Sequence, residues 1–260
     1  MRPSTPRWIR TFLIGSLVLN LMFIVLAGVF IQRRGGYHYV SSVFSRLFAS
    51  EEEQKAGYNP VNTLRYKERV SIFEEINIEP DMIFIGDSLI ERAEWSEFFP
   101  NIPVVNRGIS GDTTAGVLNR LDPLEITVSE NTEVFLYIGI NDLLEGIPHD
   151  VIIENYRKII DFFKGRPNKG LFIQNLMPLN EDLCRHIRSN NLLIDNDSIK
   201  EFNRKLYELA IEMGVSYIDL YSWMVNSIDQ LPEEYTFDGL HLNGKGYSHW
   251  VNLINSFLET

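Results

Sequence analysis

The chain has 260 residues, of which 45% are hydrophobic and 23% charged, as in a folded α/β domain of ordinary size with an appendage. Residues 1–50 hold six arginines and no acidic residue, so the 18 basic and 35 acidic residues of 51–260 give that region a net charge of −17. An acidic domain repels phosphate backbones, which argues against nucleic acid as a partner.

After a short tail, 1–10, residues 11–31 form a run of 21 residues without a charge. As a helix this run would be about 32 Å long, enough to cross the hydrocarbon core of a membrane. A cleaved signal peptide, cut before Gly28, is the competing interpretation. The apolar run continues to Ile31, which favours an uncleaved single-pass anchor. Val29 stands where a lipoprotein would have its cysteine, which argues against a lipid anchor.

Residues 32–61 contain a glycine pair and the charged stretch EEEQKAG, which predicts a stalk or linker before a folded domain over 62–260. Arginines flank residues 11–31 about equally, so the positive-inside rule leaves the orientation close to a tie. A short N-terminal tail followed by a large domain favours an anchor whose domain lies outside the cytoplasm.

Within the domain, short apolar runs predict strands at 82–85, 102–105, 134–138, 171–174 and 215–218. Stretches with helical spacing separate them, including 150–163, 197–213 and 243–258. Alternation of strands and helices predicts a three-layer αβα domain with a mostly parallel five-stranded sheet. Active sites of such folds form beyond the carboxyl ends of the strands.

Polar segments follow these strands at four places: Gly86-Asp87-Ser88, NRGISGDTT (106–114), GIND (139–142) and DGLHLN (238–243). Each has a structural interpretation. Ser88 could cap a helix, the glycines could turn the chain, Asn141 could cap the next helix, and Asp238 could form an Asx turn.

Together these residues meet the requirements of acyl transfer. His241 can take the proton of the Ser88 hydroxyl, and Asp238 can orient and stabilise the imidazole. The backbone N–H groups of Ser88 and Gly108 and the side-chain amide of Asn141 can form an oxyanion hole. The positive end of a helix starting at Ser88 would add to it.

Residues GDSL at 86–89, the glycine of NRGISGDTT, GIND and DGLH resemble, in order, the sequence blocks of the SGNH/GDSL hydrolase family. NRGISGDTT and DGLHLNGKGY look most like its small members, such as platelet-activating-factor acetylhydrolase catalytic subunits and bacterial carbohydrate acetylesterases. The family's Ser, Gly, Asn and His fall on Ser88, Gly108, Asn141 and His241, and its acid on Asp238. The resemblance implies a flavodoxin-like fold and ester hydrolysis without a metal or cofactor.

The main hypothesis is therefore a membrane-anchored serine esterase that removes short acyl groups, such as acetyl, from a glycan or small ester. A lysophospholipase or thioesterase is a second interpretation. A catalytically silent glycan-binding module is a third, although the intact Ser88, Asp238 and His241 argue against silence.

Overall fold

The computed structural model describes residues 59–76, 78–122, 128–187 and 194–258. The chain divides into two compact units, 1–57 and 58–260, and the described residues lie in the second. The predicted anchor at 11–31 and nearly all of the predicted linker lie outside the described residues. Within the part described, no helix is long and apolar enough to span a bilayer.

The domain is built on one parallel five-stranded sheet with strand order β2-β1-β3-β4-β5. This is the flavodoxin-like order, and it confirms the predicted fold. The strands are β1 (Met82–Gly86), β2 (Val104–Gly108), β3 (Glu133–Tyr137), β4 (Gly170–Gln174) and β5 (Ser216–Ile218).

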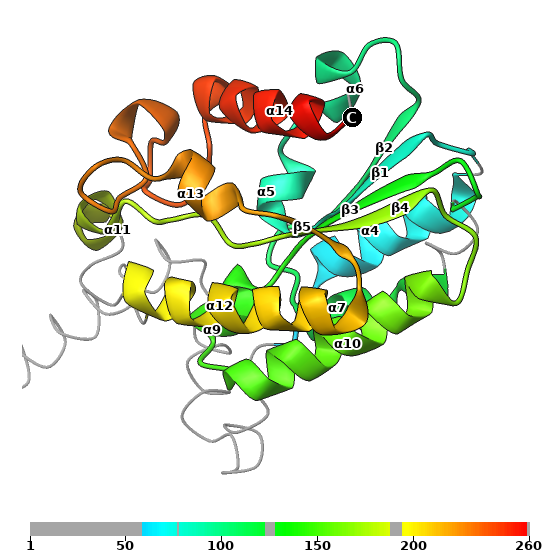
Figure 1. Cartoon of the computed structure of the whole chain (residues 1–260), viewed down its shortest axis with the longest axis horizontal. Coiled ribbons are helices and arrows are strands. Elements are labelled where there is room, and N and C mark those ends of the chain that lie inside the picture. The colour runs from blue at the N-terminus through cyan, green and yellow to red at the C-terminus, as the bar shows by residue number, and fades with distance from the viewer. Residues whose placement is uncertain (1–58, 77, 123–127, 188–193, 259–260) are drawn as a thin grey trace, which may run out of the picture. The chain divides into compact units, whose positions relative to one another are not determined.

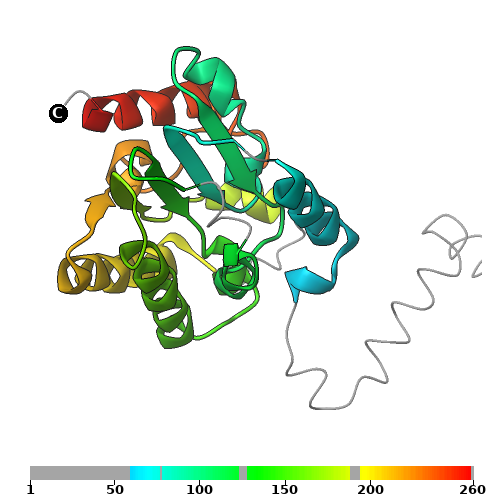
Figure 2. The same cartoon turned by 90° about the vertical axis from the view of Figure 1, so that its right-hand side faces the viewer.

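Helices cover both faces of the sheet, with α13 and α14 on one side and α10 and α12 on the other (Figures 1 and 2). The helical elements are η1 (Pro60–Asn62), α4 (Leu64–Glu75), α5 (Ser88–Glu91), α6 (Trp95–Phe98), α7 (Thr114–Asn119), α9 (Ile140–Leu144), α10 (His149–Lys164), α11 (Glu181–Ile187), α12 (Asn196–Met213), α13 (Leu220–Met224), η2 (Glu233–Tyr235) and α14 (Gly244–Leu258).

The long helices follow the apolar periodicity of the sequence. The buried face of α10 consists of Ile152, Tyr156, Ile159, Ile160 and Phe163, which recur at helical spacing. Helix α12 ends at Gly214, whose φ of +62° provides the left-handed terminus predicted for it. On the opposite face, Trp250 of α14 packs edge-on against Trp95 at 5.3 Å between ring centroids.

Strand β2 differs from its prediction. The sequence indicated 102–105, but the strand runs over 104–108 and includes the polar residues Asn106 and Arg107. Arg107 is only 2% exposed, and its guanidinium carbon lies 4.8 Å from the centroid of the Phe73 ring of α4. A buried arginine in a strand breaks the apolar pattern, so the prediction stopped too early.

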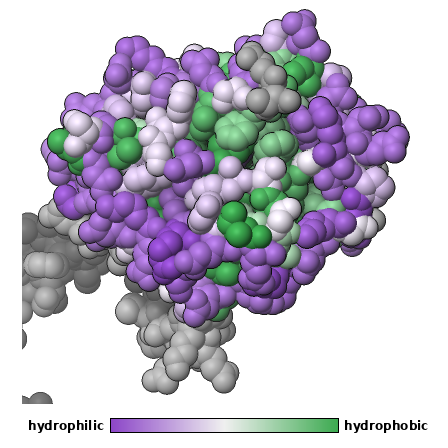
Figure 3. Space-filling model, viewed as in Figure 1, coloured by the Kyte–Doolittle hydropathy of each residue, from purple (hydrophilic) through white to green (hydrophobic). Residues whose placement is uncertain are grey.

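Apolar residues also reach the surface. On the face shown in Figure 3 they gather near the centre of the domain, and hydrophilic residues surround them.

Candidate active site

Ser88 lies where strand β1 passes into helix α5. Asp87, and not Ser88, caps this helix, because its Oδ1 accepts a hydrogen bond from Leu89 N at 2.9 Å. Gly86 is required just before, since a Cβ there would lie 2.0 Å from the carbonyl oxygen of Tyr137. The Ser88 hydroxyl is thus not used for capping, and its Oγ lies 3.0 Å from His241 Nε2.

His241 is held by a tight turn between η2 and α14. Its Nδ1 lies 2.6 Å from Asp238 Oδ2, and its backbone N–H donates to Asp238 Oδ1 at 2.7 Å. Gly239 allows the turn with a φ of +83°, and the Thr236 hydroxyl donates to the His241 carbonyl at 2.7 Å. Asp238 thus forms the Asx-type turn and also orients the imidazole.

The Asp238 carboxylate is stabilised in its charged form. Burial raises its pKa, but hydrogen bonds from the side chain and backbone of His241 and from Leu240 N outweigh this and lower the pKa to about 2. An ionised carboxylate at this place can hold a proton on Nδ1, in which case Nε2 is the ring nitrogen that can accept a proton from the Ser88 hydroxyl.

Asn141 is not a helix cap. Gly139, with a φ of +119°, is the N-cap of α9, and it makes no side-chain capping bond. The Asn141 amide donates to the carbonyl of Asp112 at 2.8 Å. An amide has two N–H donors, so the second remains available to a ligand.

Gly108 does not lie in a loop but is the last residue of β2, paired in register with Gly86. Its N–H donates to Asn106 Oδ1 at 2.9 Å, so this donor is already used. Gly111, in the following turn, has a φ of +80°, and no partner is found for its N–H among residues 59–258 that the structure describes. The same holds for the N–H of Ser88.

Asp112 connects this turn to Asn141, because it directly follows Gly111 and its carbonyl accepts from the Asn141 amide. Gly111 is therefore a better candidate than Gly108 for an oxyanion donor. Helix α5 is only four residues long, so the helix dipole expected at Ser88 is small.

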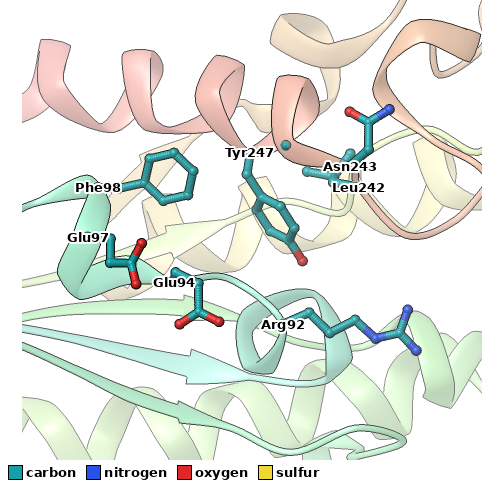
Figure 4. A pocket seen from close by; sticks show the side chains of 8 residues that line it. Arg92, Glu94, Glu97, Phe98, Leu242, Asn243 and Tyr247 are labelled. Carbon is teal, nitrogen blue, oxygen red and sulfur yellow. The ribbon is translucent and has the colours of Figure 1, made fainter.

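A cavity of about 520 Å³ lies between α5, α6 and α14 (Figure 4). Its lining includes Arg92, which directly follows α5, and Leu242, which directly follows His241, but neither Ser88 nor His241 itself. Phe98 and Tyr247 give it an aromatic wall, and the charged side chains of Glu94 and Glu97 lie opposite. It can accommodate a small polar group that also has an apolar face.

The order of these segments along the chain is that of a known family. Residues 84–249 match the family described as GDSL-like Lipase/Acylhydrolase. The chain belongs to the GDSL hydrolases.

Individual relatives support this assignment. The chain is 28% identical over 182 residues to the platelet-activating factor acetylhydrolase IB subunit alpha2 of Rattus norvegicus, an alignment of 65% of this chain and 72% of that protein. A solved structure described as a putative platelet activating factor from Streptococcus pneumonia is 27% identical, with a TM-score of 0.67 over 75% of this chain and 92% of that one. An acetylxylan esterase from Geobacillus stearothermophilus shares the fold at 17% identity, with a TM-score of 0.51 over 66% of this chain and 91% of that one. This GDSL hydrolase is thus an ester-hydrolysing enzyme.

The site of this GDSL hydrolase also contains buried ionisable groups for which the sequence patterns predicted no contacts. Arg120 pairs with Asp112 at 2.8 Å and donates to the Gly86 carbonyl at 3.2 Å. Asp142 accepts from the backbone and hydroxyl of Thr114. Burial raises the pKa of Asp87 to about 8, although the bond from Leu89 opposes the change. Over the residues described, no group of His, Cys, Asp or Glu side chains is arranged to hold a metal ion.

Asp87 and Asp142 fall within the polar segments at 86–88 and 139–142, and Asp112 and Thr114 fall within 106–114, whereas Arg120 lies outside all of these segments. Their partners lie in other segments of the chain, so the sequence gives the residue types without the contacts.

Proposed function

We propose that this GDSL hydrolase cleaves carboxylic esters through an acyl-enzyme on Ser88, with His241 as general base and acid and Asp238 as its orienting carboxylate. The observation that carries the proposal is the continuous contact from Ser88 Oγ through the imidazole to Asp238. A serine hydroxyl becomes a useful nucleophile only when such a base accepts its proton.

In the first half of the reaction, Ser88 Oγ attacks the ester carbonyl while its proton passes to His241 Nε2. The tetrahedral intermediate collapses when Nε2 returns this proton to the leaving alkoxide, which departs as the alcohol. In the second half, Nε2 takes a proton from a water molecule while the water oxygen attacks the acyl carbonyl. The second tetrahedral intermediate collapses when Nε2 returns this proton to Ser88 Oγ, which breaks the bond to the acyl group, releases the carboxylic acid and restores the serine hydroxyl.

The negative charge of the tetrahedral oxygen needs fixed donors. Ser88 N–H, the second N–H of the Asn141 amide and Gly111 N–H are the donors we assign to it. The bond between Asn141 and Asp112 favours this set, because it fixes the amide beside the turn that contains Gly111.

For the substrate we propose a short acyl group, such as acetyl, carried by a glycan or small ester. The 28% identical relative is named an acetylhydrolase. The cavity that Leu242 and Tyr247 line has mixed polar and aromatic walls, which suit a sugar better than a long acyl chain.

A series of p-nitrophenyl esters of increasing acyl length, tested on the full-length enzyme, addresses this part of the proposal. Highest kcat/KM at acetate is the expected result. Highest kcat/KM at long chains would indicate a lysophospholipase or thioesterase. No hydrolysis at any length would favour a silent glycan-binding module.

We also propose that residues 11–31 anchor the enzyme in a membrane, with its domain outside the cytoplasm, since this run of 21 residues is uncharged while residues 51–260 are acidic. The protein should then stay in the membrane fraction after a carbonate wash, and protease added to intact cells should degrade the domain. Release by the wash would exclude the anchor, and a mature N-terminus at Gly28 would show cleavage.

A further inference from the structure

Glu91 connects the helix that carries Ser88 to the turn that contains Gly111. It is the last residue of α5, three positions after Ser88, and its side chain is 7% exposed. Its Oε2 accepts a hydrogen bond from Ser110 N at 2.6 Å. Ser110 directly precedes Gly111, so one carboxylate holds both the nucleophile's helix and the oxyanion turn.

The other carboxylate oxygen is held by helix α4. Glu91 Oε1 is paired with Arg65 and lies 3.3 Å from Arg69 Nε. Arg69 also donates to the Gly108 carbonyl at 3.3 Å from Nη2. Both oxygens therefore have partners, and the side chain has one orientation that satisfies them all.

The contact is made by a charged group. Burial raises the pKa of Glu91, but the hydrogen bonds from Ser110 and the pairing with Arg65 outweigh this and lower it below its usual value. An ionised acceptor makes a stronger hydrogen bond to a backbone N–H than a neutral one. Glu91 thus remains charged over the pH range in which an ordinary imidazole titrates.

Helix α5 also lies directly against the end of β2. A Cβ on Gly108 would be 2.2 Å from Glu91 N. The backbones of the two segments are therefore fixed relative to each other at Gly108, and Glu91 extends this constraint along the turn to Ser110.

We propose that Glu91 is a positioning residue that sets the distance between Ser88 Oγ and the oxyanion donor Gly111 N–H. The inference rests on the acyl-enzyme mechanism proposed above. Glu91 acts through Ser110 without touching the substrate. Its loss would therefore reduce the stabilisation of the transition state more than the binding of the ester in the ground state.

Three substitutions of Glu91 test separately its negative charge, its side-chain length and its hydrogen-bond acceptor for Ser110 N. Glu91→Gln keeps an acceptor for Ser110 N but loses the arginine pairing, Glu91→Asp keeps the charge but is one methylene too short, and Glu91→Ala removes both. We expect kcat of the Asp and Ala variants to fall about 10- to 100-fold with KM unchanged, and the Gln variant to be intermediate. The matched control is Glu212→Gln, which breaks the exposed pair between Arg157 and Glu212 and should leave kcat unchanged.

A trifluoromethyl ketone provides the readout that a general structural defect would not move. Ser88 Oγ adds to the ketone carbonyl of this inhibitor, and the resulting negative oxygen lies in the oxyanion hole. The Ki of the inhibitor should therefore rise by the same factor by which kcat/KM falls. The acyl-length profile of the wild type is measured first, and it tests the proposed function by itself. The variants are then compared with the wild type on the ester that the wild type hydrolyses fastest, so the ratio of their kcat values tests the role of Glu91. If Glu91→Ala does not fold, the Asp variant carries the comparison. Values of kcat and Ki within twofold of wild type in the Asp variant, or a fall in kcat without a rise in Ki, would overturn the proposal.

Discussion

His241 is joined to Asp238 twice, through its imidazole Nδ1 at 2.6 Å from Oδ2 and through its backbone N–H at 2.7 Å from Oδ1. The same carboxylate therefore fixes both the ring and the turn from which the ring projects.

Asp238→Asn tests what the charge adds, because an amide oxygen can replace only one of these acceptors. We expect kcat to fall roughly 10³–10⁴-fold, because the amide favours the wrong imidazole tautomer. Steady-state kinetics at pH 7 measure this, and a loss below tenfold would contradict an orienting role for Asp238.

Ser88 and His241 are expected to act as one unit. Ser88→Ala and His241→Ala should each lower kcat by roughly 10⁴–10⁶-fold, and the double variant should be little worse than either. A fluorophosphonate should label the wild type at Ser88, which mass spectrometry of the digested protein can locate. Multiplicative losses in the double variant, or a label on another serine, would count against the shared mechanism.

Asn141→Ala removes an oxyanion donor in the proposed mechanism. We expect kcat to fall roughly 10²–10³-fold with little change in KM, since the interaction strengthens only when the carbonyl oxygen becomes charged. Asn141→Asp should be at least as damaging, because its carboxylate would repel the oxyanion. Kinetics and the thermal midpoint are measured on the same sample, and near-normal kcat in the Ala variant would leave backbone N–H groups as the whole hole.

Gly108→Ala should affect stability, because the new Cβ would lie 2.2 Å from Glu91 N and 2.6 Å from Glu91 Cα, both backbone atoms. We expect the free energy of unfolding to fall by about 1–3 kcal/mol or more. Gly244→Ala is the control, since a Cβ there meets no atom within 4 Å and should change stability by less than about 0.5 kcal/mol. Equal urea midpoints for the two variants would show that α5 and β2 are not packed this closely.

Asp87 should make stability depend on pH. Its pKa is raised from 3.8 to about 8 in the folded state, mainly by burial, so the folded protein binds this proton more tightly than the unfolded chain. The stabilisation is present below pH 3.8 and is lost as the pH rises towards 8. Asp87→Asn keeps a capping oxygen for Leu89 N and removes the titration. Urea unfolding should therefore show that the free energy of unfolding of the variant rises relative to that of the wild type from pH 5 to 8. A constant difference across that range would contradict the raised pKa.

Local patterns were sufficient for most of the fold. The buried face of α10 and the Gly214 terminus of α12 follow from helical periodicity and from the left-handed freedom of glycine. The end of β2 could not be predicted this way, because Arg107 is buried against Phe73, a residue from another segment.

The same limit applies to the site. The residue types and their order indicated Ser88, Asn141, Asp238 and His241, and the structure brings Ser88, His241 and Asp238 into contact. The choice between Gly108 and Gly111 as oxyanion donor depends on which of the two backbone N–H groups already has an acceptor. The structure shows that Gly108 N–H donates to the Asn106 side chain. Glu91 gave no local signal, because its partners are on α4 and in the turn after β2.

Ser88 and His241 are separated by 153 positions in the chain. Helix α14 is joined to the segment of Ser88 by the hydrogen bond from the Tyr247 hydroxyl to the Leu89 carbonyl at 2.9 Å. A ribosome synthesises Ser88 long before His241, so the emerging chain has a serine without its base. Contacts of such sequence separation form late and slowly. In the proposed mechanism, a nascent chain that has not yet reached His241 cannot hydrolyse esters, and activity begins only once α14 has left the exit tunnel and docked.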